Sequence, residues 1–227
     1  MFNLKKLNFW KKKEFVLLSL LFLIGFFLRS FRLKGLLIFA YDQGRDAIVI
    51  MDMIKNAKFF RLIGPTTGLQ GFFLGPVFYY LILPFYWLGK GNPLYPAYFL
   101  AFLGALVIPA VYFLAKEILG KKNALIPAVL LTFSFGAIEY SRWLSNPAPM
   151  ILFSILFAFF LLKSIDGKIF WAILSGAFLA FCLQLEFANT VFYFPLILIY
   201  PLFLRREKKA FYKFIFFFLT FLITMLH

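Results

Sequence analysis

The sequence predicts an all-α, polytopic membrane protein, and three observations support this fold class. Of the 227 residues, 63% are hydrophobic and 22% are aromatic, whereas a soluble domain is only about half apolar. The mean hydropathy is +0.90, and a water-soluble core of this size could not bury 36 Phe residues. The net charge of +15 lies in short basic clusters between apolar runs, which is typical of cytoplasmic membrane flanks and argues against nucleic-acid binding.

The first predicted element is an apolar run at 15–28, which follows five lysines. No small-residue cleavage site follows this run, so we expect an uncleaved signal anchor with a cytoplasmic amino terminus. Arg29 comes directly after the run, and a long arginine side chain can extend its guanidinium toward the headgroups. We therefore expect Arg29 to lie at the membrane interface and the helix to continue to about Leu33.

Seven further apolar runs follow, separated by Gly, Pro or charged clusters: 72–88, 94–115, 124–140, 148–162, 169–185, 190–204 and 211–226. In the first of these, the segment between Pro76 and Gly89 is interrupted by Pro84 and is shorter than the roughly 20 residues that a crossing needs. If it does not cross, seven spans place 15 of the 24 Lys and Arg residues inside, in the amino terminus and in loops at 116–122, 163–168 and 205–213. An eighth span would instead put two strongly basic loops outside. The prediction is one module over 1–227, with about seven transmembrane helices and residues 34–93 forming an outer loop.

The outer loop is predicted to contain two interfacial helices. From Asp46, the apolar residues Ile48, Met51 and Ile54 recur near helical spacing, and an acidic residue suits the first turn of a helix. The second helix, over 76–88, presents aromatic residues of the kind that settle at headgroup depth: Tyr79, Tyr80, Tyr86 and Trp87. Between the two helices, the segment "IGPTTGLQG" is a turn-rich connector.

The candidate site consists of polar and aromatic residues of three outer loops. These residues are Asp42, Arg45, Asp46, Arg61, Tyr79, Tyr80, Arg142, Asn146 and Glu186. A carboxylate with arginines nearby can deprotonate a hydroxyl and bind a phosphate, although the spacing alone also fits ordinary solvated loop charges. The acidic residues lack a metal-ligand motif and the one cysteine, Cys182, lies in an apolar run, so we expect neither a metal nor a cofactor.

Four motifs in this order carry a family resemblance: "YDQGRDA" after the first span, a Gly-Pro aromatic helix, "AKEILGKKNALIPAVLL" and "YSRWLSNPAPMILF". Together they resemble the integral-membrane GT-C glycosyltransferases of family 39, the protein-mannosyltransferase and aminoarabinose-transferase-like group. The resemblance spans essentially the whole chain and matches the amino-terminal seven-span module of that fold. Since such enzymes usually continue with more spans, the resemblance also implies that the 227 residues are truncated at the carboxy end.

The resemblance assigns roles to two residues of the first outer loop. It implies that Asp42 is the catalytic base and that Arg45 lies near the phosphate of a lipid-linked donor. The sequence departs from the family at Leu74 and Gly75, where relatives often carry Lys or His, and at Asn146, where some relatives carry Asp. Arg61 or Arg142 would then supply the missing cation.

The predicted function is sugar transfer at the outer face of the cell membrane. The donor would be a polyprenyl-phosphate sugar, and the acceptor a hydroxyl of a glycan, lipid or protein. The sequence contains neither a Gly-rich phosphate loop nor a Rossmann pattern that would bind a nucleotide sugar. Two alternatives remain open: a non-catalytic component of lipid-sugar transport or assembly, and an inactive fragment. Span centres such as "VLLSLLFLIGFF" hold almost no polar groups, which argues against transport.

Overall fold

The computed structural model describes residues 4–68, 71–204 and 210–225, and within them the regular structure is helical apart from one isolated β-bridge between Thr66 and Phe73. The prediction of an all-α protein is therefore confirmed. In chain order the elements are α1 (Leu4–Ser30), α2 (Leu33–Leu36), α3 (Tyr41–Lys55), α4 (Val77–Leu88), α5 (Leu94–Leu119), α6 (Leu125–Phe133), α7 (Phe135–Arg142), α8 (Met150–Asp166), α9 (Ile169–Leu185), α10 (Phe187–Thr190), the 3₁₀ turn η1 (Val191–Tyr193), α11 (Phe194–Leu204) and α12 (Ala210–Met225).

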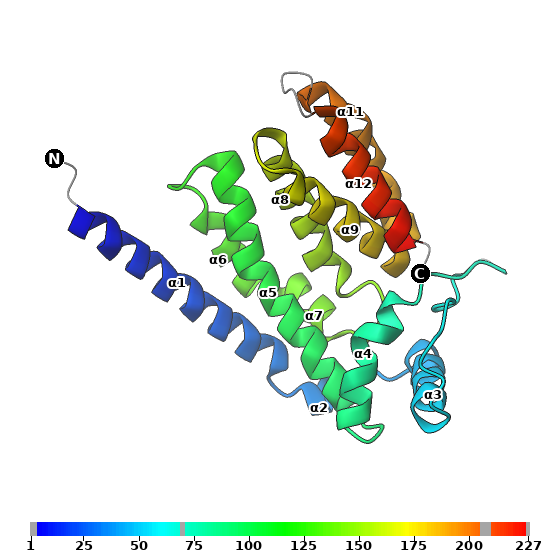
Figure 1. The fold of residues 1–227 in the computed structure, drawn as a ribbon. Coiled ribbons are helices and arrows are strands. Elements are labelled where there is room, and N and C mark those ends of the chain that lie inside the picture. The colour runs from blue at the N-terminus through cyan, green and yellow to red at the C-terminus, as the bar shows by residue number, and fades with distance from the viewer. Residues whose placement is uncertain (1–3, 69–70, 205–209, 226–227) are drawn as a thin grey trace.

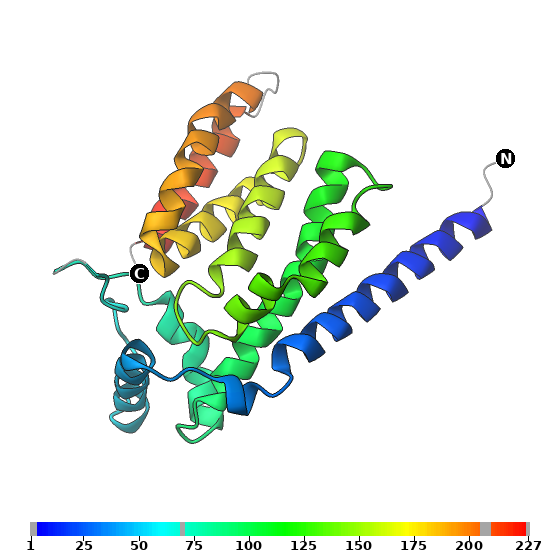
Figure 2. The ribbon, with the colours of Figure 1, turned by 180° about the vertical axis from the view of Figure 1, so that it is seen from behind.

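The connections between the long helices lie at two opposite ends of the bundle. The beginning of α1, the α5–α6 turn and the α8–α9 turn lie at one end, whereas α2, α3, α4 and the α7–α8 connection lie at the other (Figures 1 and 2). The loops at 116–122 and 163–168, both predicted to be cytoplasmic, therefore share an end. The predicted outer loop lies at the opposite end, which we call the α3–α4 end. The third predicted cytoplasmic loop, 205–213, begins with residues 205–209, which are outside the described residues.

The outside of the bundle is covered by large apolar side chains. Phe27, Leu130 and Leu198 are each exposed over most of their surface, as are apolar residues on several other helices. Contiguous exposed apolar surface of this kind is rare on soluble monomers and marks a membrane or a partner. Within the described residues, α5 is the one helix that is long and apolar enough to cross a membrane by length and composition, and α4, α9 and α12 are shorter apolar helices.

The structure corrects both the start and the buried face of the first helix in the outer loop. α3 begins at Tyr41 rather than Asp46, because the side chain of Gln43 accepts a hydrogen bond from the backbone N–H of Ala40 and closes the first turn there. The face that packs on the bundle contains Asp46, Ile50 and Met53, and Ile48 is 73% exposed. The predicted helix of the outer loop over 76–88 is present as α4.

The span predicted at 124–140 is divided into two helices. Ser134 has an extended conformation between α6 and α7, and its side chain accepts a hydrogen bond from the N–H of Ala137, which caps α7. The break leaves backbone carbonyls of α6 without helical partners. One of them, the carbonyl of Leu131, instead accepts a hydrogen bond of 2.9 Å from Arg29.

Arg29 is buried between α1, α6 and α7, so the prediction that it reaches the interface is wrong. Its side chain is 1% exposed, and its other donors bind Ser141 Oγ at 3.2 Å and the carbonyl of Gly25 at 3.1 Å. Arg142 in turn donates to the backbone carbonyls of Leu28 and Arg29. The break between α6 and α7 provides a carbonyl acceptor for Arg29 that the sequence pattern could not reveal. In addition, α1 ends at Ser30 rather than near Leu33.

We expect Arg29→Ala to destabilise the protein by at least about 2 kcal/mol. The substitution removes the hydrogen bonds that the buried guanidinium donates and leaves the carbonyl of Leu131 without a partner. The measurement is thermal unfolding of the purified protein in detergent. Lys34→Ala, which removes an exposed cation from the adjacent α2, is the matched control and should change the melting temperature little. Equal melting temperatures for the two variants would contradict this role of Arg29.

Candidate functional site

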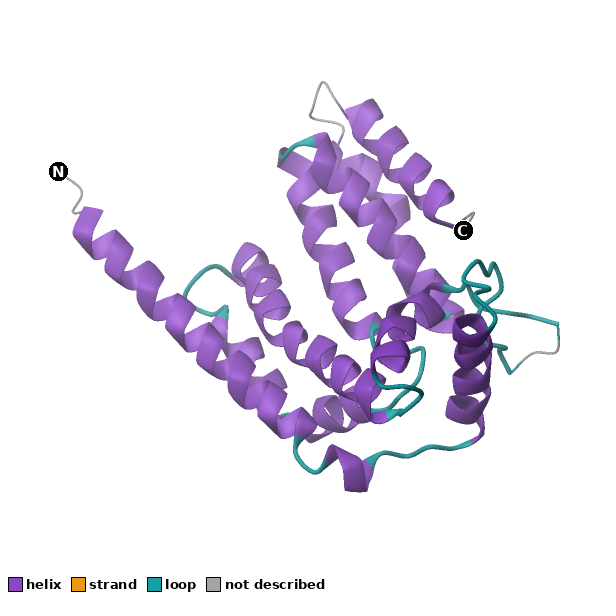
Figure 3. Cartoon of the chain, turned by 60° about the horizontal axis from the view of Figure 1, so that its bottom comes forward, coloured by secondary structure: helices purple, strands orange, loops and turns teal. Residues whose placement is uncertain are grey.

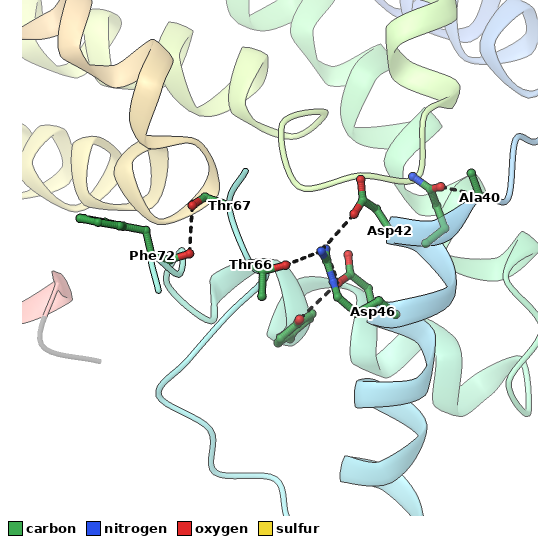
Figure 4. Close-up of polar contacts among 9 residues, drawn as sticks. Ala40, Asp42, Asp46, Thr66, Thr67 and Phe72 are labelled. Atoms are coloured by element: carbon green, nitrogen blue, oxygen red, sulfur yellow. Dashed lines mark hydrogen bonds and ion pairs between the residues drawn. The ribbon is translucent and has the colours of Figure 1, made fainter. Parts of the chain in front are cut away.

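The candidate site is built on the first two turns of α3, where one arginine joins two carboxylates. Arg45 lies three residues after Asp42, a spacing that places both on one face of the helix. Arg45 Nη1 is 3.0 Å from Asp42 Oδ1, while its Nε and Nη2 are each 2.9 Å from Asp46 Oδ1. The guanidinium therefore lies between the two acidic side chains (Figure 4).

A third partner of Arg45 comes from the connector between α3 and α4. Arg45 Nη1 donates a hydrogen bond of 2.6 Å to Thr66 Oγ1 (Figure 4). Thr66 is held by its β-bridge to Phe73, so this stretch of the connector has a defined position. Sequence reasoning did not predict Thr66, since it lies 21 residues from Arg45 in a segment whose only visible signal was its turn-forming composition.

The helix α4 completes the cluster through Tyr79, whose hydroxyl donates to Asp46 Oδ1 at 3.2 Å. Both side chains are buried. Burial raises the pKa of the Asp46 carboxyl, although Arg45 and the Tyr79 hydroxyl oppose this rise. Burial, and next the negative charge of Asp46, raise the pKa of Tyr79, so its hydroxyl remains a donor at neutral pH. Asp46 is therefore an interior anchor for Arg45 and Tyr79.

The two carboxylates of the cluster differ in exposure. The Asp42 side chain is 58% exposed, whereas that of Asp46 is almost fully covered. Burial lowers the pKa of Arg45, but the charges of Asp46 and Asp42 raise it by more, so the net shift is upward and the guanidinium stays charged. The cluster therefore presents an accessible carboxylate beside a fixed cation, which is the combination needed to accept a proton next to a bound anion.

Arg61 and Tyr80 lie at the edge of this cluster. The backbone N–H of Arg61 donates to the Tyr80 hydroxyl at 2.8 Å, and that hydroxyl in turn donates to the Arg61 carbonyl at 2.8 Å. The guanidinium of Arg61 is 5.9 Å from the ring centroid of Tyr79, within the range of a cation–π interaction. The structure thus brings together six of the predicted site residues: Asp42, Arg45, Asp46, Arg61, Tyr79 and Tyr80.

The other three predicted site residues make their contacts elsewhere. Arg142 donates to carbonyls at the end of α1, Asn146 Nδ2 donates to the Leu185 carbonyl at 2.6 Å, and Glu186 Oε1 accepts from the N–H of Ala188 at 3.4 Å. These are contacts with the backbone at the end of α1, at the end of α9 and in α10. They do not join these side chains to the Arg45 cluster. Among the described residues, no group of three or more His, Cys, Asp or Glu side chains could hold a metal ion.

A known protein family matches most of the chain. A profile described as dolichyl-phosphate-mannose-protein mannosyltransferase matches residues 74–227, about two thirds of the chain. The chain belongs to this family. Membership confirms the resemblance to membrane glycosyltransferases that the sequence motifs indicated.

The match to this mannosyltransferase family covers only part of the candidate site. Tyr79 and Tyr80 on α4 lie inside the matched region, whereas Asp42, Arg45 and Asp46 on α3 precede it. The family is membrane-embedded and uses a lipid-phosphate sugar. No curated protein and no solved structure gives a significant match to the chain.

The raised pKa of Asp46 leads to a prediction about the pH dependence of stability. Because the folded-state pKa lies above its ordinary value of about 3.9, the stability that this group contributes is present below that value and is lost as the pH rises through the folded-state pKa. Asp46→Asn does not titrate and should keep this contribution. We expect the melting temperature of the variant, relative to the wild type, to be highest at neutral pH and to fall toward the acid range. A difference that is independent of pH would contradict the upward shift.

Proposed function

We propose that this member of the family transfers a sugar from a polyprenyl-phosphate donor to an acceptor hydroxyl at the outer membrane face, with Asp42 as the general base. The observation that carries the proposal is the division of the two carboxylates around Arg45. Asp46 is buried and holds the arginine, whereas Asp42 is exposed and can meet a substrate. Family membership supports a lipid-phosphate donor.

In this mechanism the acceptor oxygen attacks the anomeric carbon as the bond from that carbon to the donor phosphate breaks. The proton of the acceptor hydroxyl moves to a carboxylate oxygen of Asp42, and the electron pair of the breaking bond leaves with the lipid phosphate. A base for this step must lie within hydrogen-bond reach of the hydroxyl. The exposure of Asp42 leaves it accessible to an acceptor hydroxyl, and its contact with Arg45 holds its position.

Arg45 is suited to stabilise the leaving phosphate. Its Nε and Nη2 are held by Asp46, which leaves Nη1 directed toward Asp42 and the hydroxyl of Thr66. A phosphate oxygen can replace Thr66 as the acceptor and form a charge-assisted hydrogen bond. Arg61 is a second cation close to this position, and it is a better candidate than Arg142, whose Nε and Nη2 donate to carbonyls of α1.

We also propose a topology for this activity: seven spans, a cytoplasmic amino terminus and an outward-facing α3–α4 end. The arrangement of turns at two ends supports it, because two of the basic loops lie opposite α3 and α4 (Figure 1). The charge bias of the sequence then gives the orientation. In this topology the divided helices α6 and α7 together form one span.

Cysteine labelling in intact cells tests the topology. A membrane-impermeant maleimide should label Lys55→Cys, at the exposed end of α3, and should not label Lys122→Cys, in the α5–α6 turn. Both positions are exposed, so a difference reports the side of the membrane rather than burial. Labelling at position 122 without permeabilisation would disprove this orientation.

The role of Asp42 is tested by Asp42→Asn, which we expect to lower sugar transfer by about a hundred- to ten-thousand-fold, as loss of a general base typically does. Membrane insertion and melting temperature should be unchanged. Asp52→Asn is the matched control, since Asp52 is an exposed acid on the same helix that contacts Asn56. A variant at position 42 with most of the wild-type rate would show that Asp42 is an ordinary solvated charge.

The donor is tested by offering a polyprenyl-phosphate sugar and a nucleotide sugar separately to protein reconstituted in lipid. We expect turnover with the lipid-linked donor alone. Arg45→Lys should raise the KM for that donor, because lysine keeps the charge but loses the planar fork that engages several oxygens at once. Turnover with a nucleotide sugar in the absence of a lipid carrier would contradict the proposal. Movement of the lipid-linked sugar across the bilayer without transfer would instead favour a transport component.

A further inference from the structure

The connector between α3 and α4 exposes an unusual amount of apolar surface. We call its described residues, 57–68 and 71–75, the outer lobe. Six of its large apolar side chains are between 52% and 79% exposed: Phe59, Phe60, Leu62, Ile63, Phe72 and Phe73. Figure 3 shows the connector extending beyond the helices next to α3. Such a patch marks an interaction surface.

The outer lobe is a fixed part of the fold and not a loose loop. The N–H of Gly64 donates to the carbonyl of Leu74 at 3.0 Å, and the two arms of the lobe run so close together there that a Cβ atom at Gly64 would meet the backbone of Gly75. Thr66 binds Arg45 of α3, and Arg61 shares two hydrogen bonds with Tyr80 of α4. The exposed apolar side chains are therefore presented by a braced segment.

The base of the outer lobe lies at the level where two long helices end. Gly75 packs against the side chain of Gln184, which is next to the last residue of α9. Gln184 Nε2 donates to the carbonyl of Thr224, which is next to the last residue of α12, at 2.6 Å. If α9 and α12 cross the membrane, the lobe leaves the bundle at headgroup depth. This position fits a lipid surface.

The charged side chains of the outer lobe and of the end of α3 before it are all positive. Residues 53–75 contain no Asp or Glu, and they contain three cations, Lys55, Lys58 and Arg61. Lys55 and Lys58 are exposed. Aromatic and aliphatic side chains combined with basic residues are the composition of segments that lie in the interface and bind anionic lipids.

From these observations we infer that the outer lobe is a lipid-binding element that inserts its apolar side chains into the headgroup region of an anionic outer leaflet. Lys58 binds the lipid phosphates, while Phe59, Phe60 and Phe72 enter the acyl boundary. Thr66 belongs to the same lobe, so insertion of the lobe into the membrane also holds Thr66 against Arg45. The inference rests on the proposed topology and not on the proposed sugar transfer.

The test is fluorescence quenching of the full chain in nanodiscs. Phe60→Cys is labelled with bimane, and quenching by doxyl-labelled phospholipid is compared with quenching by aqueous iodide. Cys182 is fully buried, so labelling is directed to the introduced cysteine. Asp52→Cys, on the exposed side of α3, is the matched control for a site near the lobe. Phe72→Cys is the second lobe position if the first variant does not fold.

We expect doxyl lipid to quench bimane at position 60 several-fold more strongly than at position 52, and iodide to show the opposite order. Lys58→Glu should weaken the doxyl quenching in nanodiscs that contain phosphatidylglycerol, and less so in phosphatidylcholine alone. Equal access of iodide to both positions would overturn the inference, because the lobe would then lie in water. Protection of position 60 from both quenchers would also overturn it and would indicate a protein cover.

Discussion

The arrangement of the α3–α4 end depends on one guanidinium. Arg45 binds Asp42 and Asp46 within α3, and it donates a hydrogen bond to Thr66 in the connector. Asp46 also accepts a hydrogen bond from the hydroxyl of Tyr79 on α4. A buried carboxylate without partners would be costly, and its pairing with a cation and a hydroxyl makes the interior position tenable. Removal of this guanidinium would leave Asp46 with only the Tyr79 hydroxyl among these partners. It would also release the connector from α3.

The same network gives Asp46 and Asp42 different surroundings. Asp46 is a buried anchor, because Arg45 and Tyr79 both bind its Oδ1 atom. Asp42 has a single contact in the cluster and remains open to solvent. Two carboxylates four residues apart on one helix therefore have different environments, which is how a protein assigns different tasks to identical groups.

A second set of contacts lets the bundle accept a cation in its interior. Arg29 is buried, and its hydrogen bonds go to carbonyls of Gly25 and Leu131 and to the hydroxyl of Ser141. In a low-dielectric environment, freed backbone groups and charged side chains must satisfy each other inside the protein. The break at Ser134 thus frees a carbonyl that the buried Arg29 satisfies. Arg142 adds a further hydrogen bond to the carbonyl of Arg29 near the end of α1.

The sequence by itself determined the helical class, the membrane setting, the family resemblance and the positions of most helices, because hydropathy and helix punctuation act over short stretches of chain. It also placed Asp42, Arg45 and Asp46 close together, since they are neighbours on one helix. Only the tertiary structure decided that Asp46 is buried and Asp42 exposed, because that difference depends on where α4 packs. The contacts of Thr66, Arg29 and Asn146 join residues far apart in the chain, where no periodic signal exists. Such contacts follow from the docking of helices and loops that local sequence patterns do not encode.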